Sequence, residues 1–205
     1  MDDPFLLDGP ASARATILLA HGAGAPMDSA GMTAMAGAIA SAGFRTVRFE
    51  FDYMASRRRS GARKPPPRAE TLIPEYVRAI EKLGSRTPLV IGGKSMGGRV
   101  ASMIADDLRA AGKIVGLLCL GYPFHPPNNP EQLRTAHLID LMTPSLICQG
   151  TRDEFGAREQ RFHVGVDARA GGHVGRVIEA GADSCPGLDL HLVSCRGELA
   201  HAGGR

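Results

Sequence analysis

The 205-residue sequence has no tryptophan, and aromatic residues make up only 5% of it. Basic residues outnumber acidic ones by only 24 to 21, and a net charge of +3 is too small to predict a nucleic-acid partner. No apolar run approaches the ~20 residues that cross a bilayer. The first ten residues carry acids where a signal peptide would carry basic residues. We therefore expect a cytoplasmic protein that does not enter a membrane.

Cysteine is also sparse, with four residues in the chain. Cys119 and Cys148 lie in apolar runs, where buried thiols acting as small hydrophobes are expected. The other two lie near the C-terminus with two histidines, in the order C-x5-H-x3-C-x5-H. That order matches no common zinc spacing, so we expect no metal site and no disulfide framework.

Hydrophobic residues make up 43% and charged residues 22% of the chain, as in ordinary globular proteins. Strand patterns occur at 16–22, 44–51, 88–93, 114–123 and 143–150. Helical spacing occurs at 29–43, 69–83 and 96–112. This alternation predicts an α/β fold, a doubly wound, mostly parallel sheet with helices on both faces. The absence of a linker or repeat predicts a single domain over residues 1–205.

In such sheets, ligands bind beyond the carboxyl ends of the strands. The segment HGAGAP, residues 21–26, follows the strand at 16–22. Its small residues allow a sharp turn that leaves backbone N–H groups free for a ligand, but a plain strand-to-helix turn fits equally well.

The segment GKSMG follows the strand at 88–93 and precedes a predicted helix, the context that the G-x-S-x-G motif requires. Glycines on both sides permit the sharp turn that lifts the Ser95 hydroxyl above the sheet. The same turn points the N–H of Met96 to where a tetrahedral oxyanion would form. A phosphate-binding loop would need a glycine at position 88, which is Pro88, so that alternative is excluded.

A carboxylate follows the strand at 143–150, in the segment TRDEFG. A hydrolase of this plan carries at that position the acid that orients its histidine. Asp153 is the predicted acid, and Glu154 is the neighbouring alternative. The order Ser95 then Asp153 matches the chain order Ser, Asp, His, so a catalytic histidine should follow.

Six ordered motifs over about residues 14–160 carry a family resemblance: LLAHGAGAPMDS, VRFEFDYM, RR…GARKPPPRAE, GGKSMGGRVAS, LGYPFHPP and QGTRDEFG. They resemble the α/β-hydrolase superfamily, and within it the small dienelactone-hydrolase-like branch. That branch includes the hydrolase-like domains of a testis-expressed protein and of an NSL acetyltransferase-complex subunit. The resemblance implies Ser95 as nucleophile, Asp153 as triad acid, and the N–H groups of Ala23 and Met96 as oxyanion hole.

The resemblance fades after about residue 160, so the C-terminal part, 161–205, looks degenerate. Relatives carry Asp-His after a last strand. The nearest counterpart here is RVIEAGADSCPG, residues 176–187, which starts like a strand, but its Asp183 is followed by Ser184. Either the tail has diverged or it is read in a shifted frame, and the shifted frame is slightly favoured. Among the remaining histidines, His191 is the tentative base because it follows the last predicted strand.

The segment RRRSGARKPPPR, residues 57–68, is predicted to be a basic loop stiffened by proline. Arg58, Arg59 and Lys64 in it would form an anion-binding site. A solvated surface loop is an equally good interpretation.

The sequence thus predicts a serine hydrolase that acts on small ester-like substrates and needs no cofactor. The alternative is a hydrolase-fold interaction module that lacks the triad histidine. Under this alternative the protein would bind a protein partner. An imidazole within reach of Ser95 would favour the enzyme.

Overall fold

The computed structural model describes residues 4–62, 65–150, 153, 155 and 176–180 of the chain. These residues form one sheet of seven strands in the order β1-β3-β2-β4-β5-β6-β7. The strands are β1 (Phe5–Asp8), β2 (Thr16–Ala20), β3 (Arg45–Phe49), β4 (Leu89–Lys94), β5 (Gly116–Leu120), β6 (Ser145–Gly150) and β7 (Arg176–Ala180). The helices are α1 (Ala30–Ser41), α2 (Asp52–Ser60), η1 (Ala69–Leu72), α3 (Ile73–Leu83), α4 (Met96–Ala110) and α5 (Ala136–Ile139).

Strands β2 to β7 run parallel, and β1 pairs antiparallel with β3 at the edge. Every residue of β2 and β5 is buried. This agrees with their continuously apolar sequences, because a central parallel strand is covered on both faces.

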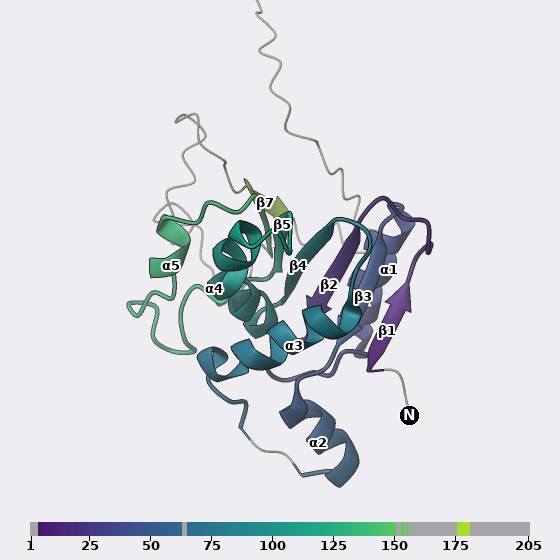
Figure 1. The fold of residues 1–205 in the computed structure, drawn as a ribbon. Helices are drawn as coiled ribbons and strands as arrows, with labels where there is room; N and C mark the ends of the chain where they lie inside the picture. Colours follow the sequence, from purple (N-terminus) through teal and green to yellow (C-terminus); the bar gives the residue numbers. More distant parts are fainter. Residues whose placement is uncertain (1–3, 63–64, 151–152, 154, 156–175, 181–205) are drawn as a thin grey trace, which may run out of the picture.

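Helices cover both faces of the sheet (Figure 1). On one face, Met32 and Ile39 of α1 join Leu19 in a buried cluster. On the other face, α3 and α4 pack in a larger cluster that includes Tyr76 and Val100. The Tyr76 hydroxyl of α3 contacts the backbone of β4, where it accepts from the Gly92 N–H at 2.9 Å. The predicted doubly wound fold class is confirmed.

Two local features differ from the sequence prediction, one predicted wrongly and one missed. Residues 57–60 belong to the helix α2, which ends at Gly61 with a φ of 70°, whereas a loop was expected there. The strand β1 was not predicted at all, since its four residues are stabilised by pairing with the distant strand β3.

The strand expected at the start of 176–187 is present as β7, which pairs in parallel with β6. The rest of the predicted atypical tail, and Lys64, Glu154 and His191, lie outside the described residues. Within the described part of the chain, no helix combines the length and the apolar character needed to span a membrane.

Candidate active site

Ser95 occupies the turn between β4 and α4 with a φ of 48° and a ψ of −114°. A positive φ is uncommon for a residue other than glycine, and holding it costs roughly 1–3 kcal/mol. The surrounding backbone holds it: the Ser95 N–H donates to the Leu120 carbonyl at 2.9 Å, and its own carbonyl accepts from the Arg99 N–H at 3.0 Å.

The glycines around Ser95 are required by close backbone contacts. A Cβ on Gly97 would lie 2.6 Å from the Ala20 carbonyl oxygen and 2.7 Å from that of His21. A Cβ on Gly93 would also collide with the Ala20 carbonyl oxygen. Because β2, β4 and the start of α4 approach this closely, only glycine fits at these two positions.

The turn after β4 lies at the point where the strand order reverses. Strand β2 pairs with β3 on one side and with β4 on the other, placing Ala20 beside Gly93. The crevice outside the carboxyl ends of such strands is where open α/β sheets bind ligands. Ala23, Ser95 and Met96 line a common cavity of about 890 Å³ there. The structure therefore brings together the three residues predicted as nucleophile and oxyanion hole.

The N–H groups of Ala23 and Met96 form no hydrogen bond with any other described residue. Free N–H groups beside a serine hydroxyl are the donors that an oxyanion would need.

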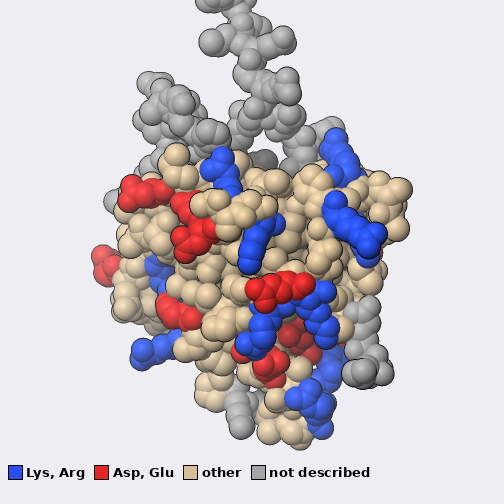
Figure 2. Space-filling model, viewed as in Figure 1, with Lys and Arg blue, Asp and Glu red and all other residues tan. Residues whose placement is uncertain are grey.

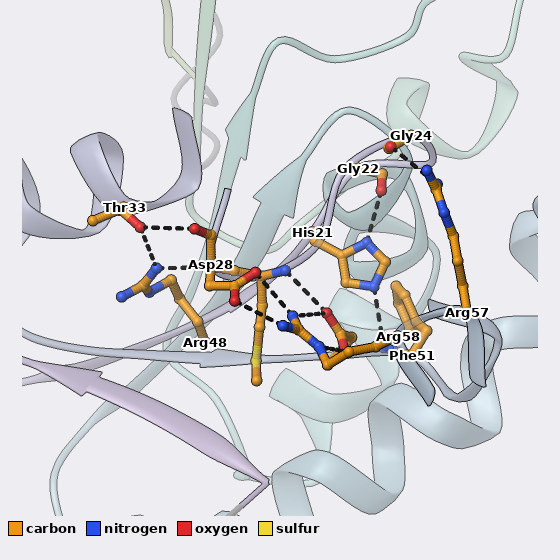
Figure 3. Close-up of polar contacts among 11 residues, drawn as sticks. His21, Gly22, Gly24, Asp28, Thr33, Arg48, Phe51, Arg57 and Arg58 are labelled. Carbon is orange, nitrogen blue, oxygen red and sulfur yellow. Dashed lines mark hydrogen bonds and ion pairs between the residues drawn. The ribbon is translucent and has the colours of Figure 1, made fainter. Parts of the chain in front are cut away.

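A buried histidine shapes the loop that carries Ala23 (Figure 3). His21 Nε2 accepts from the Phe51 N–H at 3.1 Å, so the proton lies on Nδ1, which donates to the Gly22 carbonyl at 2.7 Å. The Tyr53 hydroxyl donates to the Ala23 carbonyl at 3.0 Å. Burial lowers the pKa of His21 and keeps the imidazole neutral.

Helix α2 supports the same loop with two arginines (Figure 3). Arg57 donates to the Gly24 carbonyl at 3.4 Å. Arg58 donates through two nitrogens to Asp28, at 2.8 Å each, and at 2.9 Å to Glu50, whose side chain is 6% exposed. The arginine donors thus connect α2 to the loop after β2.

These contacts bear on the anion-binding site predicted in this segment. The Arg58 guanidinium is already neutralised by two carboxylates, which leaves it poorly suited to a further anion. Arg59 donates to the Ser56 hydroxyl at 3.3 Å. On the face of the molecule in Figure 2, basic side chains are interspersed with acidic ones. The anion site at Arg58, Arg59 and Lys64 stays a prediction without structural support.

Asp153, the predicted triad acid, follows β6. Its Oδ1 accepts from the Phe155 N–H at 3.0 Å. Its Oδ2 lies 3.2 Å from the position a Cβ would take on Gly121, at the carboxyl end of β5. Phe155 lines the cavity that contains Ser95. Asp153 therefore lies at the expected edge of the sheet, while its predicted partner His191 lies outside the described residues.

One histidine in the cavity wall, His137 of α5, was not singled out from the sequence. The hydroxyls of Ser102 and Tyr122 donate to the carbonyls of Arg99 and Arg134, at 2.8 and 3.1 Å. His137 Nε2 lies 2.8 and 3.3 Å from these two hydroxyl oxygens, and all four contacts are satisfied together when Nε2 carries the proton. Burial, with a further contribution from Arg99, lowers the pKa of His137, so the ring is neutral.

In the described ranges, no group of three or more His, Cys, Asp or Glu side chains is placed to hold a metal ion. The cavity instead contains a serine whose backbone is strained, with free backbone N–H groups beside its hydroxyl. This arrangement suits attack on a carbonyl group.

Comparison with known proteins gives the same fold. An α/β-hydrolase serine hydrolase homologue from Coxiella burnetii is 18% identical with a TM-score of 0.64, covering 87% of this chain and 81% of its own. The dienelactone hydrolase from Anabaena variabilis is also 18% identical, with a TM-score of 0.64 and coverage of 87% and 79%. Est1E from Butyrivibrio proteoclasticus, with ferulic acid bound, is 16% identical, with a TM-score of 0.62 and coverage of 87% and 85%.

At these identities the solved structures support the fold alone. The assignment to a family rests on the sequence. The family model of the alpha/beta hydrolase domain matches residues 13–173, which is more than half of the chain. The chain is therefore a member of the α/β-hydrolase family.

Proposed function

We propose that the protein is a serine hydrolase that cleaves esters or related acyl bonds, with Ser95 as its nucleophile. The observation that carries this proposal is the positive φ of Ser95 on a strand-to-helix turn at the reversal of strand order. That conformation is costly and exposes the hydroxyl to a cavity, and a purely structural turn would favour glycine at this position.

The proposed reaction follows from the groups around the cavity. Ser95 Oγ loses its proton to a base and attacks the substrate carbonyl carbon, and the carbonyl oxygen becomes an oxyanion. The N–H groups of Ala23 and Met96 donate to that oxyanion. The base then gives its proton to the alcohol, which leaves. In the second half of the reaction, the base takes a proton from water, the water attacks the acyl carbon, and Ser95 Oγ leaves with that proton as the acid is released.

The base is proposed to come from the chain after β7, with Asp153 orienting it. Strand β7 ends at Ala180, which pairs with Gly150 at the end of β6, and Asp153 follows β6 in the chain. His191 is the candidate in that segment. The single domain over residues 1–205 and the cytoplasmic location are proposed on the sequence grounds given above.

Small esters are the proposed substrates, supported by the likeness to Est1E with ferulic acid bound and to a dienelactone hydrolase. The cavity of about 890 Å³ is of the size that small-molecule sites have.

Hydrolysis of p-nitrophenyl butyrate by the purified full-length chain tests the proposal. Ser95→Ala should reduce kcat/KM by at least about a thousandfold, since removing one member of a triad leaves only binding and the oxyanion hole. Ser41→Ala is the matched control, because Ser41 lies on α1 and donates only to the Gly37 carbonyl. Equal hydrolysis by wild type and Ser95→Ala would contradict Ser95 as the nucleophile, and a folded wild type without hydrolysis would favour the interaction module.

A further inference from the structure

The cavity beside Ser95 carries an excess of positive charge. Three arginines line it: Arg68 precedes η1, Arg99 lies on α4, and Arg134 precedes α5. Among the lining residues that the structure describes, Glu70 is the one carboxylate. Three arginines and one acid therefore line the pocket that also contains the proposed nucleophile.

Glu70 neutralises only one of these cations. Its Oε1 accepts from Arg99 Nη2 at 2.7 Å. The backbone N–H of Glu70 and the Arg99 guanidinium hold the pKa of this carboxyl below its ordinary value, so it is ionised at neutral pH. Arg99 is largely buried, its side chain being 16% exposed, and its Nε–H is buried with no partner among the described residues.

The other two arginines lack such a partner. The guanidinium groups of Arg68 and Arg134 form no ion pair and no hydrogen bond with another residue in the described ranges, although both backbone carbonyls accept from side-chain hydroxyls. Burial lowers the pKa of Arg134 and repulsion from Arg99 lowers it further, while Tyr122 and Glu70 act in the opposite direction without reversing the shift. The repulsion between Arg99 and Arg134 persists because charges in a partly buried site are screened less than on an open surface. A second anion in the cavity would relieve it.

His137 lines the cavity and contacts the Tyr122 hydroxyl, and neither side chain adds a negative charge. Tyr122 donates to the Arg134 carbonyl, and burial raises the pKa of Tyr122, so it stays neutral. His137 is also neutral, for the reasons given above. Among the described lining residues, Glu70 therefore supplies the one negative charge beside three arginines, and it is already hydrogen-bonded to Arg99.

We propose that the physiological substrate is a small ester that carries a free carboxylate, bound by Arg134 and Arg68 while its ester carbonyl reaches Ser95. A planar guanidinium matches a carboxylate with two parallel hydrogen bonds, which gives orientation as well as affinity. This inference rests on the proposed hydrolase function, and it adds the charge of the substrate to it.

The first test compares two esters of similar length that differ in charge, p-nitrophenyl hemiglutarate and p-nitrophenyl valerate. The wild type should hydrolyse the anionic ester with about tenfold higher kcat/KM, the value of one charge-assisted hydrogen bond. Arg134→Gln and Arg68→Gln should each remove most of this preference through a higher KM for the hemiglutarate, with the valerate ester little changed.

Arg78→Gln is the matched control, since Arg78 is an arginine of α3 with a 61% exposed side chain and does not line the cavity. Thermal unfolding of each variant verifies that it is folded. Equal kcat/KM for both esters in the wild type, or a preference that Arg134→Gln and Arg68→Gln leave unchanged, would overturn the inference while the hydrolase proposal stands.

A second measurement does not depend on turnover. Calorimetric titration of Ser95→Ala with glutarate should give saturable binding that dimethyl glutarate does not give and that Arg134→Gln weakens about tenfold. If neither ester is hydrolysed but glutarate binds in this way, the hydrolase proposal fails and the carboxylate site stands. If glutarate does not bind to the folded protein, the carboxylate site is overturned.

Discussion

The Ser95 N–H and the Leu120 carbonyl are joined by a hydrogen bond of 2.9 Å that connects the turn after β4 to the end of β5. The proposed nucleophile is thus positioned by the sheet itself, not by a free loop. Sites built on rigid elements hold reacting groups more accurately than sites on loops. The turn therefore depends on the close approach of the strands and helix around it, and its glycines can be tested directly.

Gly97→Ala should destabilise the protein by about 1–3 kcal/mol, because the new Cβ would collide with the Ala20 and His21 carbonyl oxygens. Gly37→Ala is the matched control: it also lies in a helix, and its Cβ would meet nothing within 4 Å. That change should stabilise the protein by about 0.4–1 kcal/mol. Urea unfolding of both variants measures the difference, and equal stabilities would contradict the proposed crowding at Gly97.

Stability should fall between pH 7.5 and pH 5.5. The pKa of buried His21 is lowered in the folded protein, whereas the unfolded chain has the ordinary value of about 6.5. As pH falls below that value, the unfolded state binds the proton first, so unfolding becomes more favourable, by at most about 1.4 kcal/mol per pH unit.

Urea unfolding at the two pH values measures this loss in the wild type and in His21→Gln. The variant should be less stable at pH 7.5 but should lose less on acidification, with the remaining slope coming from His137, whose pKa is lowered as well. Identical slopes for both proteins would show that His21 is not the titrating group.

Glu70→Gln should act in the opposite direction to the arginine variants. Removing this carboxylate frees Arg99 for a substrate anion and raises the net positive charge of the cavity. The preference for p-nitrophenyl hemiglutarate over the valerate ester should therefore increase severalfold. Steady-state kinetics on both esters provides the measurement, and a decreased preference would mean that Glu70 supports the anion site.

The proposed base can be separated from the cavity histidine with two variants. His191→Gln should lose nearly all ester hydrolysis, since serine without a base is a weak nucleophile at neutral pH. His137→Gln should keep most of its kcat, because His137 Nε2 is already bonded to Ser102 and Tyr122. The reverse result, with His191→Gln active and His137→Gln inactive, would make His137 the base.

The sheet could be predicted from the sequence because its central strands are continuous apolar runs followed by helical spacing. β2, with all five residues buried, is an example. Two elements gave no such signal. Helix α2 has one buried residue, Met54, and its Arg58 forms ion pairs with Asp28 in the loop after β2 and with Glu50 just after β3. Strand β1 depends on pairing with residues about 40 positions away.

The same distinction holds for the candidate site. Ser95 could be found because its glycines and flanking elements are adjacent in the sequence. The charged wall could not, since Arg68, Arg99 and Arg134 come from segments that only the fold brings together. The basic run at 57–59 attracted the anion-site prediction, yet two of its arginines hold the loop after β2.

The central claim is that Ser95 is an activated nucleophile. It is tested most directly by reacting the purified full-length protein with a fluorophosphonate probe, followed by intact mass and peptide mapping. A fold check by circular dichroism accompanies the labelling. The account predicts a single adduct on Ser95 that is absent from Ser95→Ala and present in Ser41→Ala. A folded protein that remains unlabelled, or that carries its adduct on another serine such as Ser102, would contradict it.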